Sequence, residues 1–150
     1  LGVRRILVVN AAKVEKSYWE SSVVSENGWQ RQVREGLEQA VDPRLGDVSF
    51  YRGFKPFMQE IVPGIKDRYQ QMLVAHPHTT NSLAEVYRAG ASPVLLAIGP
   101  EGGWNEYELD QMGLRGFDQF TLGPRVLRVE TAVNALHGAI SVLRSLPCNM

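Results

Sequence analysis

The sequence contains one cysteine, Cys148, so no disulfide can form within the chain. It has neither a signal-like segment nor an apolar run long enough to span a membrane, so we expect a reducing, cytoplasmic setting and no membrane partner. Three histidines and the cysteine are scattered, which argues against a metal site. The 16 basic and 16 acidic residues cancel, which argues against a strongly basic nucleic-acid module but not against a local RNA-binding patch.

What is present is a chain of one domain's length, 150 residues, whose hydrophobic content of 44% is enough for a core. Apolar runs alternate with amphipathic stretches, which predicts an α/β fold with a mostly parallel sheet flanked by helices. Strands are expected at residues 6–9, 48–51, 71–75, 94–98 and 117–122. Helices are expected at residues 25–40, 81–89, 105–112 and 129–146, with another from residue 57 and one helical turn within residues 11–22.

Local signals mark where several of these helices begin and end. Ser25 is the expected N-cap of the first helix, and Pro63–Gly64 is expected to end the helix that starts near Phe57. Asn105, with Glu108 three residues later, has the pattern of a capping box. The apolar stripe of the last helix, expected in the core or in a subunit interface, comprises Ala132, Leu136, Ile140 and Leu143.

Two glycine-containing loops carry the clearest functional signal. Ile98–Gly103 ends one expected strand, and Leu122–Leu127 ends the next, with Arg128 and Glu130 directly after it. Glycines at strand ends permit positive φ angles and let a ligand approach the main chain closely. Ligands of open α/β sheets bind at the carboxyl ends of the strands, so we expect both loops to line one pocket.

Taken alone, the first loop is better explained as a tight strand-to-helix connection. It is not a phosphate loop, because no Gly-Lys-Ser/Thr follows. The dinucleotide fingerprint needs glycine at its first, third and sixth positions, and these hold Gly99, Glu101 and Trp104. The Glu101 carboxylate would repel a phosphate, whereas it would suit a cationic ligand.

Arg128 and Glu130 can be explained in more than one way. They could form a local ion pair, although residues two apart do not face each other on a helix. The helix dipole favours an acid in the first turn, so Glu130 is explained equally well by a structural role and by a functional one. For Arg128 a functional role is favoured.

Other residues with chemical potential have plain structural explanations. His76–Pro77 ends a strand and could form a third wall of the pocket, although a lone histidine there is more often a hydrogen-bonded structural residue. Glu38–Gln39 is best explained as a solvated helix end. Trp19 and Trp29 are expected in the core or an interface, whereas Trp104 could cover a ligand.

An ordered run over residues 94–143 resembles a known family. The residues that carry the resemblance are Ile98–Asn105, Glu108, Gly116–Phe117 and Leu122–Ala132. It extends more faintly to Leu1–Val3, Glu38–Gln39 and His76–Pro77, and so covers most of the chain. The family is the RsmE type, the bacterial 16S ribosomal RNA uridine-N3 methyltransferases of the SPOUT superfamily.

The resemblance implies a SPOUT-type α/β fold whose C-terminal part forms a trefoil knot, although knots are rare. It implies S-adenosylmethionine as cofactor, 16S ribosomal RNA or the small ribosomal subunit as partner, and a homodimer whose active site uses both subunits. It implies methyl transfer to uridine N3, with Arg128 stabilising charge on the base and Glu130 acting as general base or orienting Arg128. The residues that it places at the cofactor are His76, Pro77, Ile98, Gly99, Pro100, Glu101, Gly102, Gly103, Leu122, Gly123, Val126 and Leu127.

The sequence departs from the family pattern in two places. Members usually carry an N-terminal RNA-binding barrel domain, then a strand and a helix before the Leu-Gly-Val, so residues 1–150 are expected to start inside the SPOUT-type domain. The Glu-Gln pair is usually followed closely by Arg, but here Asp42 stands near that point and the arginine is Arg44. Two alternatives stay open: a non-catalytic RNA-binding or ribosome-assembly protein with this fold, and a methyltransferase acting on another RNA position.

Overall fold

The structure is a computed structural model that describes residues 2–21, 24, 28–40 and 46–146. Its strands are β1 (Arg5–Val9), β2 (Asp47–Tyr51), β3 (Gln71–Ala75), β4 (Val94–Ala97) and β5 (Phe117–Phe120). Its helices are α1 (Lys16–Glu20), α3 (Trp29–Ala40), α4 (Phe54–Pro56), η1 (Phe57–Ile61), α5 (Val62–Ile65), η2 (Lys66–Arg68), α6 (Leu83–Val86), α7 (Glu106–Leu114) and α8 (Val129–Ser145). The predicted α/β order is confirmed, while Ser25, Asp42 and Arg44 lie outside the described residues.

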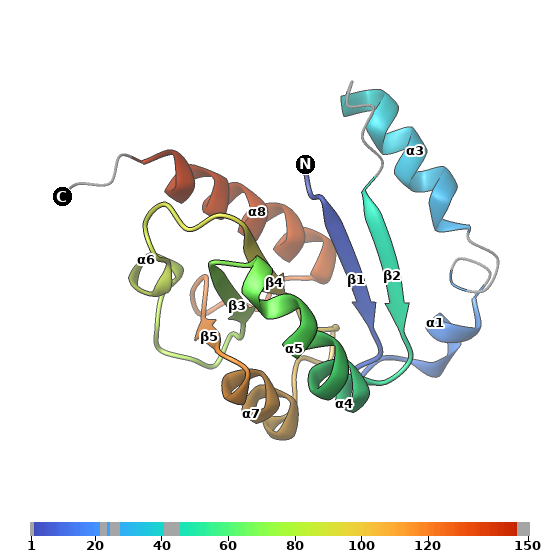
Figure 1. Ribbon diagram of the computed structural model, residues 1–150, viewed down its shortest axis with the longest axis horizontal. Helices are drawn as coiled ribbons and strands as arrows, with labels where there is room; N and C mark the ends of the chain where they lie inside the picture. Colours follow the sequence, from blue (N-terminus) through green and yellow to red (C-terminus); the bar gives the residue numbers. More distant parts are fainter. Residues whose placement is uncertain (1, 22–23, 25–27, 41–45, 147–150) are drawn as a thin grey trace.

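The strands pair in parallel, as predicted, but they form two sheets instead of one. β1 pairs with β2, and β3 lies between β4 and β5. Leu7, Val9 and Tyr51, from the two-stranded sheet, pack against the same core as the three-stranded sheet. Figure 1 shows β1 and β2 to one side of β3, β4 and β5. Side-chain packing therefore joins the two sheets where a continuous hydrogen-bond ladder does not.

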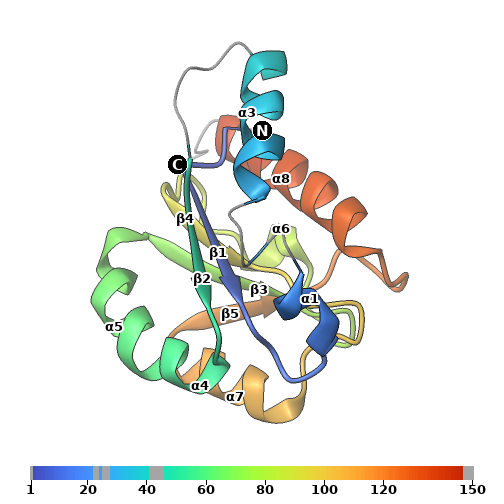
Figure 2. The same ribbon diagram turned by 90° about the vertical axis from the view of Figure 1, so that its right-hand side faces the viewer.

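The three-stranded sheet has a hydrophobic core on each face. Successive side chains of a strand point to opposite faces, and β3 follows this rule. Met72 and Val74 belong to the α7-side core, with residues of α4, η1, α5 and α7. Leu73 belongs to the α8-side core, with residues of α6 and α8 that include Leu136 and Ile140. Within the stripe predicted on the last helix, Leu136 and Ile140 are thus buried, and Ala132 and Leu143 are partly buried against the same core. Figure 2 shows the sheet between α8 and the α4, α5 and α7 group.

The helical segment that contains Phe57 runs on through Pro63–Gly64, which corrects the expected end. Helical turns continue from Phe54 to Arg68, and η1 within this segment is a π-helical turn. Pro63 lies in the first turn of α5, and because it has no N–H it cannot donate a hydrogen bond to the π-helical turn before it. The wider π-helical turn immediately before it lets the chain pass the proline without ending.

Helix α6 is shorter than predicted because a side chain replaces its next hydrogen bonds. The buried Gln71 Nε2 donates to the Val86 carbonyl at 2.8 Å, and Gln71 Oε1 accepts from the Arg88 N–H at 3.0 Å. The helix begins at a capping box in which Ser82 and Glu85 bond reciprocally. Strand β3 therefore sets the end of α6 through one buried amide.

Candidate functional site

Three segments of the predicted site follow the three strands of one parallel sheet. His76–Pro77 follows β3, Ile98–Gly103 follows β4, and Leu122–Gly123 comes just after β5. Both outer strands are in parallel register with β3, so all three strands end at the same edge. The His76 N–H donates to the Phe120 carbonyl at 2.9 Å, which ties the first segment to the end of β5. The structure therefore brings these segments together, and their binding of a ligand stays a prediction.

The first glycine loop is shaped partly by packing within the chain. A Cβ at Gly102 would lie 2.8 Å from the Lys13 Cβ, and one at Gly99 would lie 3.1 Å from the Trp104 indole nitrogen. Gly103 has a φ of +67°, and nothing lies within 4 Å of the position that its Cβ would take. The tight-connection explanation thus accounts for Gly99 and Gly102, whereas Gly103 leaves room for a ligand beside the main chain.

Trp104, which follows this loop, packs within its own chain. Its ring centroid lies 6.1 Å from that of Phe54, and it contacts the α7-side core. Its indole Nε1 is buried without a hydrogen-bond partner in the described part of the chain. Trp104 therefore packs against the core, whereas the sequence alone indicated only that it could cover a ligand.

Glu108 holds two distant loops together. It is buried, with a relative exposure of 1%. The capping box predicted for α7 is confirmed, because Asn105 Oδ1 accepts from the Glu108 N–H at 2.8 Å and Glu108 Oε2 accepts from the Asn105 N–H at 3.0 Å. In addition, Glu108 Oε1 accepts from the Ala12 N–H at 2.8 Å. One carboxylate thus fixes the loop after β1 against the start of α7.

The second loop presents uncovered apolar side chains. Leu122, Val126 and Leu127 are 45%, 69% and 38% exposed. Gly123 has a φ of +123°, and Thr121 bonds it twice, since Oγ1 donates to its carbonyl and accepts from its N–H. This tight turn ends β5 two residues earlier than predicted. Several large apolar groups exposed together indicate a surface that a ligand or a second chain covers.

Arg128 and Glu130 lie at the start of α8, directly after this loop. Arg128 is the N-cap residue of the helix, and Glu130 lies in its first turn. Both side chains are exposed, and the ion pairs found among the described residues do not include them. The local ion pair is therefore not formed. The dipole explanation for Glu130 agrees with the structure, because its carboxylate lies beside the positive end of α8.

His76 is partly buried directly after β3, and its surroundings favour the neutral form of the imidazole. Burial lowers the pKa of His76 below its ordinary value, and the nearby charge of His78 lowers it further. The two rings meet edge to face at a centroid distance of 5.4 Å. His76 Nδ1 is buried and has no hydrogen-bond partner among the residues that the structure describes. A polar atom left in this state is available to a ligand.

A family model described as the RNA methyltransferase domain matches residues 1–141. The chain belongs to this RNA methyltransferase family. A curated relative, Ribosomal RNA small subunit methyltransferase E of Treponema pallidum, is 29% identical over 137 residues, 90% of this chain and 51% of that protein. The protein of the same name from Synechocystis sp. is 30% identical over 122 residues, 77% of this chain and 38% of that protein.

A solved structure shares the fold of this family member. It is Ribosomal RNA small subunit methyltransferase E from Neisseria gonorrhoeae, bound to S-adenosyl methionine, with 26% identity and a TM-score of 0.77. The alignment covers 95% of this chain and 56% of that one. The chain spans about half the length of the curated relatives that it matches.

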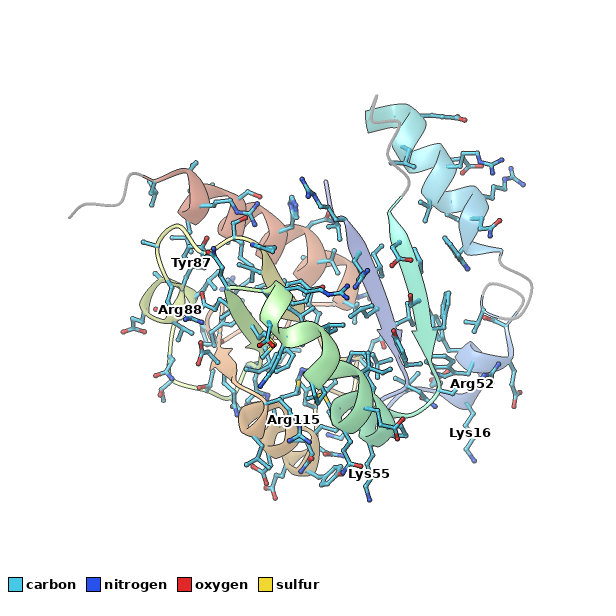
Figure 3. All side chains as sticks on the ribbon, in the orientation of Figure 1. Lys16, Arg52, Lys55, Tyr87, Arg88 and Arg115 are labelled. Carbon is cyan, nitrogen blue, oxygen red and sulfur yellow. The ribbon has the colours of Figure 1, made fainter. Side chains whose placement is uncertain are left out.

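The RNA methyltransferase domain also has a cavity that sequence reasoning missed. Its volume is about 550 Å³, and it lies between the loop after β1, helix α1, the segment after β2 and the start of α7. None of the residues predicted to bind the cofactor lines it. Lys16, Arg52 and Lys55 do, and Figure 3 shows them along the lower right part of the view. Glu38 and Gln39 are exposed on α3, in agreement with a solvated helix end.

Metal-binding clusters and membrane-spanning helices are both absent from the described part of the chain. No three of its His, Cys, Asp and Glu side chains come together in a way that could hold a metal ion. None of the helices built from the described residues is long and apolar enough to cross a membrane.

Proposed function

We propose that this chain is the catalytic domain of a cytoplasmic, S-adenosylmethionine-dependent enzyme that methylates N3 of a uridine in 16S ribosomal RNA. The observation that carries the proposal is the convergence of three predicted loops at one sheet edge in a member of an RNA methyltransferase family. Relatives named as small-subunit ribosomal RNA methyltransferases support the substrate. The relative of known structure that binds S-adenosyl methionine supports the cofactor.

The residues at this edge fit the proposed cofactor. The unpartnered His76 Nδ1 offers a polar contact, and the empty space beside Gly103 leaves room for a ligand. The exposed side chains of Leu122, Val126 and Leu127 offer an apolar surface for a flat adenine ring. A neutral His76 adds no positive charge near a cationic sulfonium.

S-adenosylmethionine, when bound, supplies an electrophilic methyl group that is attached to sulfur. Uridine N3 carries a weakly acidic proton, so attack by N3 requires that the proton be removed. In the proposal Glu130 accepts this proton, and the Arg128 guanidinium stabilises the negative charge that builds on the base oxygens. The loops that would hold the cofactor would also have to aim its methyl group at N3, so positioning would supply much of the rate.

The same proposal includes a homodimer and a knotted C-terminal segment. Exposed apolar side chains support a second copy, because Leu122, Val126 and Leu127 of the second loop are uncovered at the start of α8. A partner seated on this loop would lie beside Arg128 and Glu130, as expected for an active site that uses both subunits. Size-exclusion chromatography with light scattering measures the dimer directly.

A calorimetric titration with S-adenosylhomocysteine tests the cofactor site first. Saturable binding of one ligand per subunit is expected. No binding by a folded dimer would remove the catalytic proposal for this chain. Tight, salt-sensitive RNA binding without cofactor binding would favour the non-catalytic alternative.

A methylation assay on small ribosomal subunits then tests Arg128. Arg128→Ala should keep the affinity for S-adenosylhomocysteine and lower the methylation rate by about 10²- to 10³-fold, as for the loss of one group that stabilises developing charge. Arg68→Ala, which removes an exposed arginine of η2 outside the three loops and α8, is the matched control. An unchanged rate in Arg128→Ala with intact cofactor binding would show that the assigned role is wrong, and mapping the modified nucleotide tests the N3 assignment.

A further inference from the structure

The cavity beside α1 is a feature that the proposed function does not use. Its volume of about 550 Å³ matches a site for a small ligand. It opens where β1 and β2 end, the position at which parallel sheets bind ligands. Its far wall is the start of α7, which directly follows the loop Gly99–Gly103. A ligand in the cavity would therefore lie next to the proposed cofactor loop.

The charged side chains of the cavity are arranged to receive an anion. Lys16, Arg52 and Lys55 line it, and none of them forms an ion pair within the part of the chain described here. The lining carboxylates are Glu20 and Glu108, and both Glu108 oxygens already accept main-chain hydrogen bonds. Three cations thus line the cavity with two carboxylates, of which only Glu20 has oxygens free of main-chain hydrogen bonds, so the lining carries a net positive charge in a chain whose net charge is zero. This local excess of positive charge attracts polyanions.

The aromatic side chains of the same cavity suit a nucleobase. Tyr107 is 48% exposed, so its ring is open to stacking. Trp19 and Phe54 are buried in the wall, and the Trp19 indole Nε1 has no hydrogen-bond partner among the described residues. Single-stranded nucleic acids are bound by this combination of cations that follow the backbone and aromatic rings that stack on bases.

We propose that this cavity binds one nucleotide of a single-stranded RNA segment. Lys16, Arg52 and Lys55 hold the phosphates, and the base lies against Tyr107. The identity of the ligand as RNA rests on the proposed function, whereas the location rests on the cavity itself. Because the α7 wall continues from the cofactor loop, RNA held here would lie beside that loop.

Fluorescence anisotropy with a short fluorescein-labelled oligouridylate tests the charged part of the proposal. Lys16→Ala, Arg52→Ala and Lys55→Ala should each weaken binding and reduce the slope of log K against log salt by about 0.7 for each phosphate that is no longer neutralised. Glu20→Gln should strengthen binding, because it removes the one free carboxylate. Lys66→Ala, which removes an exposed cation of η2 outside the cavity, should bind as the unmodified chain does.

Tyr107 tests the aromatic part. Tyr107→Ala should weaken binding about 5- to 150-fold without changing the salt slope, since stacking on one base is removed, and Tyr107→Phe should restore it. If Lys16→Ala, Arg52→Ala and Lys55→Ala all bind as Lys66→Ala does, the proposal is overturned. Equal competition by polyglutamate would also overturn it, by revealing a general polyanion site.

Calorimetry with S-adenosylhomocysteine separates this proposal from the proposed function. The cavity variants should keep cofactor affinity, because none of the changed residues belongs to the three loops. Absence of cofactor binding in the unmodified chain would contradict the proposed function. The anisotropy measurements with oligouridylate would still decide whether the cavity binds RNA. Circular dichroism confirms that each variant is folded.

Discussion

Replacing Glu108 by Gln should destabilise the chain far more than the same change two residues earlier. Glu108 is 1% exposed, and its carboxylate accepts from the N–H groups of Ala12 and Asn105 at 2.8 and 3.0 Å. A glutamine keeps one oxygen acceptor and turns an NH₂ group toward the other N–H. One charge-assisted hydrogen bond, worth about 1.5–3 kcal/mol, is removed and a buried donor is left unpaired, so we expect a loss of about 2–4 kcal/mol.

Glu106→Gln is the matched control, because Glu106 lies in the same first turn of α7 but is exposed. It should cost at most about 0.3–1 kcal/mol, the value of an acid near a helix N-terminus. Urea unfolding followed by circular dichroism gives both free energies of unfolding. Equal losses in the two variants would refute the assignment of Glu108 as the link between the loop after β1 and α7.

Two glycines of the α7 region should respond to alanine in opposite directions. Gly113→Ala should raise the unfolding free energy by about 0.5–1 kcal/mol, since the site is helical and open. Gly116→Ala should lower it by about 1–2 kcal/mol, since φ is +90° there. A gain at Gly116 in urea titrations would contradict this. His76 binds a proton more weakly in the folded than in the unfolded chain, so stability should fall as pH drops below its ordinary pKa of about 6.5 and level off below the folded pKa. His76→Gln should flatten this dependence in thermal melts from pH 5 to 8, and an unchanged profile would exclude His76 as its source.

Short sequence patterns correctly predicted the features that depend on residues close together in the chain. The capping box of α7 needs only Asn105 and Glu108, three residues apart, and it forms as expected. The apolar stripe with Leu136 and Ile140 predicted a buried face of α8 without knowledge of its partner. The convergence of the glycine loops followed from parallel pairing alone, because parallel strands end at a common edge.

What the sequence did not predict depends on residues far apart in the chain. Glu108 and Ala12 are 96 positions apart, and no spacing rule connects them. The end of α6 is set by Gln71, which the strand pattern marks only as the first residue of β3. The cavity was missed because its walls come from four separate segments, and the one motif among them, the capping box of α7, predicts the start of a helix and not a ligand site.

The sequence of strand β3 also disfavours a shift of strand register, because its alternate residues pack into two separate cores. A slip by one residue would reverse every side chain. Leu73 would leave the α8-side core, Val74 would leave the α7-side core, and Gln71 would lose the carbonyl of Val86. A sheet with this shifted register would lose apolar packing on both faces. The position of His76 along the sheet is therefore fixed relative to the two glycine loops. The register of the central strand β3 thus sets the relative positions of the three segments of the candidate site.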